Sequence, residues 1–182
     1  MISFKTISKM DKTEIKKAKL DDIEALQLIS RQTFLETFAH SNTEDDMEKY
    51  LNESFSIDRQ INELNNPGSE YYLATLHNKV IGYLKLNLGQ AQTELKDQKA
   101  LEIERIYVLQ EFHGKRIGQM LYETAPSIAK KIKSEFIWLG VCENNLRAIN
   151  FYSKNGFIAF DKHTFKLGND MQTDIMMKLK IN

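Results

Sequence analysis

The chain has 182 residues, of which 25 are basic and 25 acidic, so its formal net charge at neutral pH is zero. This length suits one domain whose buried core needs no disulfide or metal for stability. A balanced charge argues against a general binder of nucleic acid or of membrane surfaces. The single cysteine, Cys142, excludes an internal disulfide, and the four histidines show no metal-ligand spacing.

The start of the chain contains no apolar run of signal-peptide length. The longest strongly apolar run, residues 136–142, is too short to cross a bilayer, so we expect a cytoplasmic protein. No repeat and no Pro-, Gly- or Ser-rich linker divides the sequence. We therefore expect residues 1–182 to form a single domain, with residues 1–12 as a flexible N-terminal extension.

Alternating apolar residues predict strands, and apolar residues three and four positions apart predict helices. Asp21 and Asp22 can cap the first helix, whereas Pro126 should remove a backbone hydrogen bond from a later helix and kink it. The expected elements, in chain order, are a strand at 14–18, a helix from about 23 to 40, a helix capped at 42–46, a helix at 57–64, strands at 71–76, 80–88 and 101–108, a helix from about 115 to 133, a strand at 136–142, a helix from about 145 to 154, and strands at 157–167 and 172–179. This order predicts an α+β fold with a mixed, mainly antiparallel twisted sheet, helices on both faces and one right-handed β-α-β unit.

The segment 112–118 lies between an apolar strand and an apolar helix. The first N–H groups of a helix have no partner within it, and the helix dipole favours an anion there. Gly114 and Gly118 would let a ligand approach the backbone, and Lys115 and Arg116 add positive charge. The segment therefore indicates a site for a phosphate-bearing cofactor, although an ordinary basic helix cap explains it equally well.

A second informative segment is the expected helix from Asn145 to Lys154. Positions 145, 148, 149 and 152 share one face, and Asn145 and Tyr152 lie about two turns, roughly 10 Å, apart. Asn145 could hold an amide-bearing ligand while Tyr152 presents a phenol. The structural alternative is a helix N-cap at Asn145 and a core aromatic at Tyr152.

Together these segments resemble the GNAT superfamily of acetyl-CoA-dependent N-acetyltransferases, and the resemblance covers nearly the whole chain. In that family the turn reads Gln/Arg-x-x-Gly-x-Gly/Ala, which places His113 first, Arg116 at the first glycine and Gly118 at the second. His113 can still donate through its ring or backbone. Because Arg116 carries a Cβ, positive φ would strain it, so we predict ordinary helical φ with its N–H facing the pyrophosphate.

The resemblance also implies a role for each segment. The strand end would pair with pantetheine as an added strand, and the Val108 N–H would stabilise the oxyanion. Tyr152 would protonate the departing thiolate, and Asn145 would contact the CoA arm. The residues expected to bind acetyl-CoA are Ile106, Tyr107, Val108, His113, Gly114, Lys115, Arg116, Ile117, Gly118, Gln119, Asn145, Ala148, Tyr152 and Lys154, and no metal is expected.

Glu102 and Glu104 are the candidates for the catalytic base. They share one strand face if alternation is unbroken, and either could take the ammonium proton directly or through water. A β-bulge, common in this strand of the GNAT fold, would break that parity, so the choice stays open. Each could instead belong to a solvated face or pair with Arg105. Cys142 has no histidine beside it in sequence, so we expect a buried, inert thiol and direct acetyl transfer in a ternary complex.

The acceptor is predicted from weaker signals. Residues 101–108, 137–141 and 172–176 look like segments of the bacterial PaiA-type spermidine/spermine N-acetyltransferases. One stretch is also acidic, and it would attract a polycation, although solvated helix faces explain the same composition. Its nine acidic residues are Glu36, Glu44, Asp45, Asp46, Glu48, Glu53, Asp58, Glu63 and Glu70, against Lys49 and Arg59.

We therefore expect an N-acetyltransferase for a primary amine, with a polyamine such as spermidine or spermine as the leading acceptor. One alternative is another amine: an amino sugar, an amino acid or a protein N-terminus. A second alternative is a non-catalytic acyl-CoA-binding regulatory module. A homodimer is a candidate assembly, and neither nucleic acid nor a membrane is expected as a partner.

Overall fold

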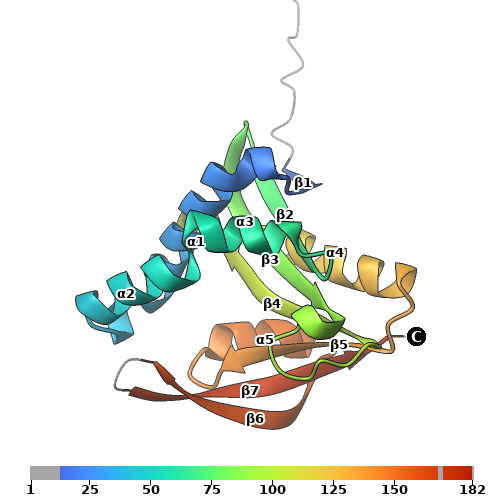
Figure 1. Ribbon diagram of the computed structural model, residues 1–182. Coiled ribbons are helices and arrows are strands. Elements are labelled where there is room, and N and C mark those ends of the chain that lie inside the picture. The colour runs from blue at the N-terminus through green and yellow to red at the C-terminus, as the bar shows by residue number, and fades with distance from the viewer. Residues whose placement is uncertain (1–12, 168–169, 182) are drawn as a thin grey trace, which may run out of the picture.

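The computed structural model describes residues 13–167 and 170–181 (Figure 1). Within these ranges the strands form one seven-stranded sheet in the order β1-β2-β3-β4-β5-β7-β6. The strands are β1 (Glu14–Lys17), β2 (Ser69–Leu76), β3 (Lys79–Leu88), β4 (Ala100–Val108), β5 (Phe136–Cys142), β6 (Ile158–Leu167) and β7 (Asp170–Lys180). The helices are α1 (Ile23–Phe38), α2 (Glu44–Ser54), α3 (Ile57–Asn65), α4 (Ile117–Lys131) and α5 (Leu146–Lys154). The predicted α+β fold with a mixed sheet and flanking helices is confirmed, while the extension proposed at 1–12 lies outside the described residues.

The ends of the predicted elements lie within about two residues of the observed ones. Thr43 caps α2, because its hydroxyl accepts from the Asp46 N–H at 3.2 Å. Asp22 stands at the N-cap position of α1, but its carboxylate accepts instead from the Lys19 N–H at 3.0 Å. α4 continues through Pro126, and the predicted kink there stays a prediction.

Helices cover both faces of the sheet because adjacent residues on its strands point to opposite sides. On β3, a Cβ added at Gly82 would lie 3.3 Å from Leu121 of α4. The next residue, Tyr83, faces the other side and stacks near Tyr71, 6.3 Å between ring centroids. α1 packs on β3 and β4 from this second side, and α3 packs on α1 and β2.

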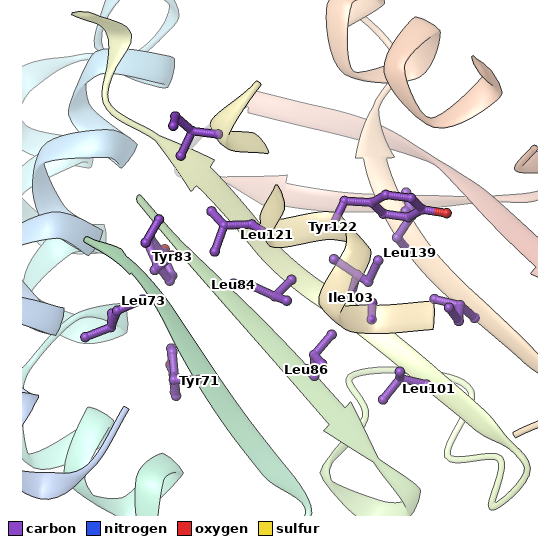
Figure 2. Packing of buried hydrophobic residues seen from close by; sticks show 14 of the residues in the cluster. Tyr71, Leu73, Tyr83, Leu84, Leu86, Leu101, Ile103, Leu121, Tyr122 and Leu139 are labelled. Carbon is purple, nitrogen blue, oxygen red and sulfur yellow. The ribbon is translucent and has the colours of Figure 1, made fainter. Parts of the chain in front are cut away.

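The main core lies between the sheet and α4 and continues under α1. Its large side chains come from every central element, so no local segment can form it alone. Figure 2 labels Tyr71, Leu73, Tyr83, Leu84, Leu86, Leu101, Ile103, Leu121, Tyr122 and Leu139 from this cluster. Burying each such side chain stabilises the fold by about 1.5–3 kcal/mol. Among the described residues, no helix is both long and apolar enough to cross a membrane.

The sheet opens between β4 and β5. These strands form the one parallel pair among the described strands, and α4 is the crossover that joins them. Their pairing covers only residues 100–102 and 136–138. β4 then continues to Val108, and β5 to Cys142, without a partner between them. The C-terminal half of β4 therefore has a free edge in the middle of the sheet.

A bulge in β4 decides which way its polar side chains point. Glu104 has no partner residue on β3, because the register shifts by one there. Arg105 contacts Glu104 at 3.1 Å, and the Asn87 amide contacts both Glu104 and Glu102. All three β4 side chains therefore lie on the side covered by α1 and α3. A bulge was expected to break the shared face of the two glutamates, but they remain on one side, because Glu104 is itself the unpaired residue and alternation is lost only between Glu104 and Arg105.

Candidate active site

A cavity of about 600 Å³, which we call the large cavity, lies between the end of β4 and the starts of α4 and α5. Every residue predicted to bind the cofactor lines it, except Lys115 and Lys154. Lys115 instead lies over the Phe112 ring, with 4.8 Å from its Nζ to the ring centroid. Lys154 is exposed in the last turn of α5. A role for these two lysines stays a prediction.

The turn before α4 does not have the predicted conformation. Arg116 has φ 65° and ψ 7°, which is left-handed, so the expected helical φ is wrong. The physical reason is its position: Arg116 is the N-cap of α4, where the chain reverses after Gly114, itself at φ 77°. A non-glycine residue in this conformation costs about 1–2 kcal/mol. The glycine in the family pattern would meet the same requirement without that cost.

This conformation exposes the first turn of α4. The first hydrogen bond of the helix runs from the Met120 N–H to the Arg116 carbonyl at 3.0 Å, so the N–H groups of residues 117–119 precede the ladder. A Cβ added at Gly118 would meet only Val108 Cγ2 at 4.0 Å, and one added at Gly114 would meet nothing within 4 Å. Free donors beside open space are what an anionic group requires.

His113 and Arg147 connect two walls of the large cavity. The His113 Nε2 lies 2.8 Å from the Val108 carbonyl, and an Arg147 guanidinium nitrogen lies 2.6 Å from His113 Nδ1. Because a guanidinium can only donate, Nδ1 accepts and Nε2 carries the proton. The His113 backbone N–H donates to the Gln110 carbonyl at 3.0 Å. Both donors that the sequence offered to a ligand are thus used within the protein, and Arg147 was not predicted.

The free edge of β4 presents backbone donors to the large cavity. The Leu109 N–H donates to the Ile81 carbonyl of β3 at 3.0 Å. Because successive N–H groups of a strand alternate in direction, those of Val108 and Ile106 point away from β3, toward the gap beside β5. Both residues line the large cavity.

On α5 the structural alternative is present, with Asn145 capping the helix and Tyr152 buried, while the functional roles of both residues stay predictions. Asn145 is the N-cap, and its Oδ1 accepts from the Ala148 N–H at 3.1 Å. Tyr152 is 7% exposed and packs its ring 5.6 Å from that of Phe157. Burial raises the pKa of the Tyr152 phenol, so the hydroxyl stays protonated at neutral pH. Among the described residues, none forms a hydrogen bond with this hydroxyl.

A second cavity of about 360 Å³, the small cavity, adjoins the large one and also contacts Tyr152. Aromatic rings form much of its wall, and most of its charged lining residues are acidic. The aromatic residues are Phe34, Phe38, Tyr50, Tyr107, Trp138 and Tyr152, and the carboxylates are Glu94, Glu102, Glu104 and Asp174. Among the described residues, no group of His, Cys, Asp or Glu side chains could hold a metal ion.

Glu102 is 2% exposed at the edge of the small cavity. Its carboxylate accepts from the Thr93 N–H at 2.8 Å, from the Thr93 hydroxyl, and from the Asn87 amide at 3.0 Å. Burial raises the pKa of Glu102, and the nearby charge of Glu104 acts in the same direction. The hydrogen bonds from Thr93 and Asn87 oppose this shift only in part.

Glu104 has the opposite environment although it lies two residues away. Burial by itself would raise its pKa, but Arg105 and Lys85 hold the pKa below its ordinary value. The Lys85 Nζ lies 2.7 Å from Glu104 and 2.9 Å from Glu63 of α3. The sequence left open an ion pair of either glutamate with Arg105, and Glu104 forms this pair at 3.1 Å. Of the two carboxylates, Glu102 is the one without a cationic partner.

Two carboxylates of the small cavity were not predicted as site residues. Burial raises the pKa of Asp174, and Glu94 raises it further. Glu94 also pairs with the His163 Nδ1 at 3.1 Å. Asp174 belongs to the segment 172–176, whose resemblance to the PaiA-type enzymes could have marked it as a candidate site residue. Glu94 lies in the loop between β3 and β4, where no pattern marks it.

The acidic stretch noted in the sequence lies elsewhere. None of its nine carboxylates lines the small cavity. Glu36 lines the large cavity and accepts from the Gln110 N–H at 2.8 Å, and Glu63 pairs with Lys85. Cys142 is half-buried rather than buried, and it lines the small cavity together with His163, which a sequence-neighbour argument could not detect.

Comparisons with known proteins agree with this geometry. The sequence model described as "Acetyltransferase (GNAT) family" matches residues 31–157. An uncharacterised N-acetyltransferase of Lactobacillus delbrueckii subsp. lactis is 40% identical over 157 residues, covering 86% of this chain and 91% of the relative. The spermidine N(1)-acetyltransferase of Thermoplasma acidophilum is 28% identical, covering 79% of this chain and 87% of that protein. The crystal structure of PaiA N-acetyltransferase from the same organism, in complex with coenzyme A, superposes with a TM-score of 0.77 at 26% identity, covering 93% of this chain and 99% of that one.

Proposed function

The chain belongs to the GNAT acetyltransferase family, and we propose that the amine it acetylates is a polyamine such as spermidine or spermine. Members of this family are N-acetyltransferases that use acetyl-CoA, so the donor and the reaction class follow from membership. The proposed acceptor is supported by the small cavity. This cavity meets the large one at Tyr152, where an amine and a thioester can come together.

The lining of the small cavity carries the proposal. Four carboxylates line it, while Arg105, the one Lys or Arg among the described residues of the lining, is paired with Glu104. The aromatic wall suits the rest of a polyamine, because methylene groups pack on rings and ammonium groups bind ring faces. The 28% identity to a spermidine acetyltransferase supports the same acceptor.

We assign cofactor binding to the large cavity. The free N–H groups of residues 117–119 would hold the pyrophosphate, with Gly118 leaving the space for it. The free edge of β4 would pair with the extended pantetheine arm in the manner of an added strand. This places the thioester close to the Val108 N–H, which is directed into the gap and would stabilise the oxyanion.

We assign the proton transfers to Glu102 and Tyr152. Glu102 would accept the first proton of the ammonium through water, because Glu104 is held as a carboxylate by Lys85 and Arg105. The neutral amine would attack the carbonyl, forming the C–N bond. As the C–S bond breaks, the Tyr152 phenol would give its proton to the thiolate, and the second amine proton would restore the phenol.

A thiol-release assay with saturating acetyl-CoA tests the proposal. The panel contains spermidine, spermine, glucosamine, alanine and a short peptide with a free N-terminus. We expect kcat/KM for spermidine to exceed that for each non-polyamine at least about tenfold, and to fall as salt is added. Glu102→Gln should abolish most turnover, whereas Glu135→Gln, which alters an exposed ion pair with Lys99, serves as the matched control.

Each other outcome would assign the protein a different function. Preference for an amino sugar, an amino acid or the peptide would replace the polyamine by that amine. Binding of CoA without turnover of any amine would indicate the silent regulatory module. The homodimer stays a prediction, which light scattering on the purified protein can test.

A further inference from the structure

Asn87 of β3 occupies an unusual place beside the two β4 glutamates. Its side chain is fully buried, and its amide nitrogen lies 3.0 Å from Glu102 Oε2 and 2.6 Å from Glu104 Oε2. Its amide oxygen accepts from the Ser69 hydroxyl at 2.9 Å. One buried amide thus contacts two carboxylates with its two N–H groups. The orientation of the amide is fixed, because both carboxylates need a donor and the hydroxyl can supply one to the oxygen.

Two adjacent carboxylates behave differently when no hydrogen-bond donor lies between them. Without a donor between them, two carboxylates in a low-dielectric site repel each other, and the pair binds one shared proton. A shared proton would occupy the oxygen that has to receive a proton from the substrate. The environment of Glu104 favours its charged form, so the shared proton would lie mainly on Glu102.

We propose that Asn87 is a positioning residue that keeps Glu102 and Glu104 from sharing a proton, and thereby leaves Glu102 free as the proton acceptor of the reaction. This inference rests on the proposed function, because it assigns the acceptor role to Glu102. Asn87 itself does not line either cavity, so it acts only through the carboxylates. Thr93 completes the arrangement by donating to both oxygens of Glu102 from the loop that follows β3.

Several other titratable or charged groups lie near Glu102, and the effect of Asn87 on its pKa has to be distinguished from theirs. The titratable or charged groups that share the small cavity with it are Tyr50 on α2, Glu104, Arg105 and Tyr107 on β4, Glu94 in the loop, Cys142 on β5, Tyr152 on α5, His163 on β6 and Asp174 on β7. Lys85 reaches the group through Glu104. A variant at Asn87 removes none of these groups, but it takes a hydrogen bond from Glu104 as well as from Glu102.

The test is the pH profile of kcat/KM for spermidine in the full-length enzyme, using Asn87→Leu and Asn87→Ser. Glu102 has to be ionised to accept a proton, so activity falls as the pH drops through its pKa. Removing a donor that stabilises the carboxylate raises that pKa. We expect the acid limb to move up by about one pH unit in Asn87→Leu, and by less in Asn87→Ser, which keeps one hydroxyl donor. Comparison with the wild-type enzyme on the same amine cancels the titration of the substrate.

A second measurement isolates the coupling. In a Glu104→Gln background the two carboxylates can no longer share a proton, so Asn87→Leu should shift the acid limb by less than half as much. A merely structural role predicts something else: equal loss of kcat at all pH values, an unmoved acid limb and a lower melting temperature. That result would overturn the proposal, as would an equal shift in both backgrounds.

The inference can fail separately from the proposed function. CoA affinity measured by calorimetry reports whether each variant is folded, because Asn87 does not contact the large cavity. If spermidine is not turned over, the titration of the Glu102 side-chain carbon is followed by NMR on glutamate-labelled protein, with Glu102→Gln identifying the signal. A rise of this pKa in Asn87→Leu supports the positioning role even then, and an unchanged pKa contradicts it.

Discussion

The two cavities share five lining residues, Tyr152 among them, but are built differently. The large cavity is lined mainly by two continuous stretches, residues 106–119 and 145–152, and much of what it offers a ligand is backbone N–H. The small cavity is lined by six consecutive residues of β4 and by residues of α1, α2, the loop after β3, β5, α5, β6 and β7. The first kind of site is determined by local backbone geometry, whereas the second exists only after the chain has folded. A family can therefore keep one donor while its members differ in their acceptors.

Removing the hydroxyl of Tyr152 should have the largest effect. Tyr152→Phe keeps the buried ring and its packing, so the variant should fold. We expect kcat to fall about a hundredfold or more, because a positioned proton donor contributes that much, while the Kd of CoA changes less than about twofold. Thiol release and calorimetry measure the two quantities. Wild-type activity in this variant would remove Tyr152 as the proton donor.

A charge placed in the large cavity should affect the donor side alone. In Gly118→Asp the new side chain enters open space, and its carboxylate would face the pyrophosphate. We expect the Kd of CoA to rise about thirtyfold through like-charge repulsion, with the KM for spermidine nearly unchanged. Stability should not fall, because an acidic residue in the first turn of a helix interacts favourably with its dipole.

Gly118→Asn is the matched control, since it adds a similar volume without charge. We expect it to weaken CoA binding several times less than Gly118→Asp does. Equal weakening by both variants would mean that space at Gly118, rather than charge, governs binding. An unchanged Kd in Gly118→Asp would place the pyrophosphate elsewhere.

A change in the small cavity should affect only the acceptor side. We expect Asp174→Asn to raise the KM for spermidine about five- to tenfold, without changing the Kd of CoA. The pKa of Asp174 is raised by burial and by Glu94, so the carboxylate loses its charge as the pH falls through that raised value. The wild-type KM should therefore increase toward acid pH, and in Asp174→Asn this dependence should flatten. Initial rates across a pH series measure both effects.

Asp58→Asn is the control for this comparison. Asp58 is exposed on α3, within the acidic stretch that the sequence analysis singled out. We expect its replacement to leave the KM for spermidine unchanged at physiological salt. If both variants raise the KM equally, the acidic surface attracts the polyamine and the small cavity does not select it.

The smallest effect is expected at the left-handed residue before α4. Arg116→Gly removes a strain of about 1–2 kcal/mol, but glycine costs about 0.5–1 kcal/mol through the greater freedom of the unfolded chain. The free energy of unfolding, from chemical denaturation, should therefore rise by at most about 1.5 kcal/mol. If the turn binds through its backbone, the Kd of CoA should change less than about threefold. A loss of more than tenfold would assign binding to the guanidinium.

Features that depend on local sequence were predictable, whereas features that depend on contacts between distant segments were not. The strands and helices were predictable because hydrophobic periodicity is local, as in β5, whose bounds agree at both ends. The lining at 106–119 was predictable because a glycine-containing helix start has its own geometry. The predicted φ of Arg116 was wrong because a strain argument was applied to a residue that the fold places at the N-cap of α4.

Other site residues had no local signal. Asn87 reads as an ordinary polar residue of a strand, and its importance comes from its register with Glu102 on the neighbouring strand. Glu94 lies in an irregular loop, and its place in the small cavity depends on how that loop crosses the sheet. The environments that separate Glu102 from Glu104 depend on Lys85, which is contributed by another strand. Sequence spacing within one segment could not supply any of these contacts.

The short parallel pairing of β4 and β5 also bears on self-association. An unpaired strand edge can bind a strand of another molecule, and repetition of that contact leads to aggregation. The unpaired half of β4 lies in a cavity bounded by α4 and α5, so a single extended chain of atoms can reach it whereas another sheet cannot. At one outer edge of the sheet, β1 has only four residues, and three of them, Glu14, Lys16 and Lys17, are charged. The unpaired edge of β4 is thus kept out of reach of copies of this chain.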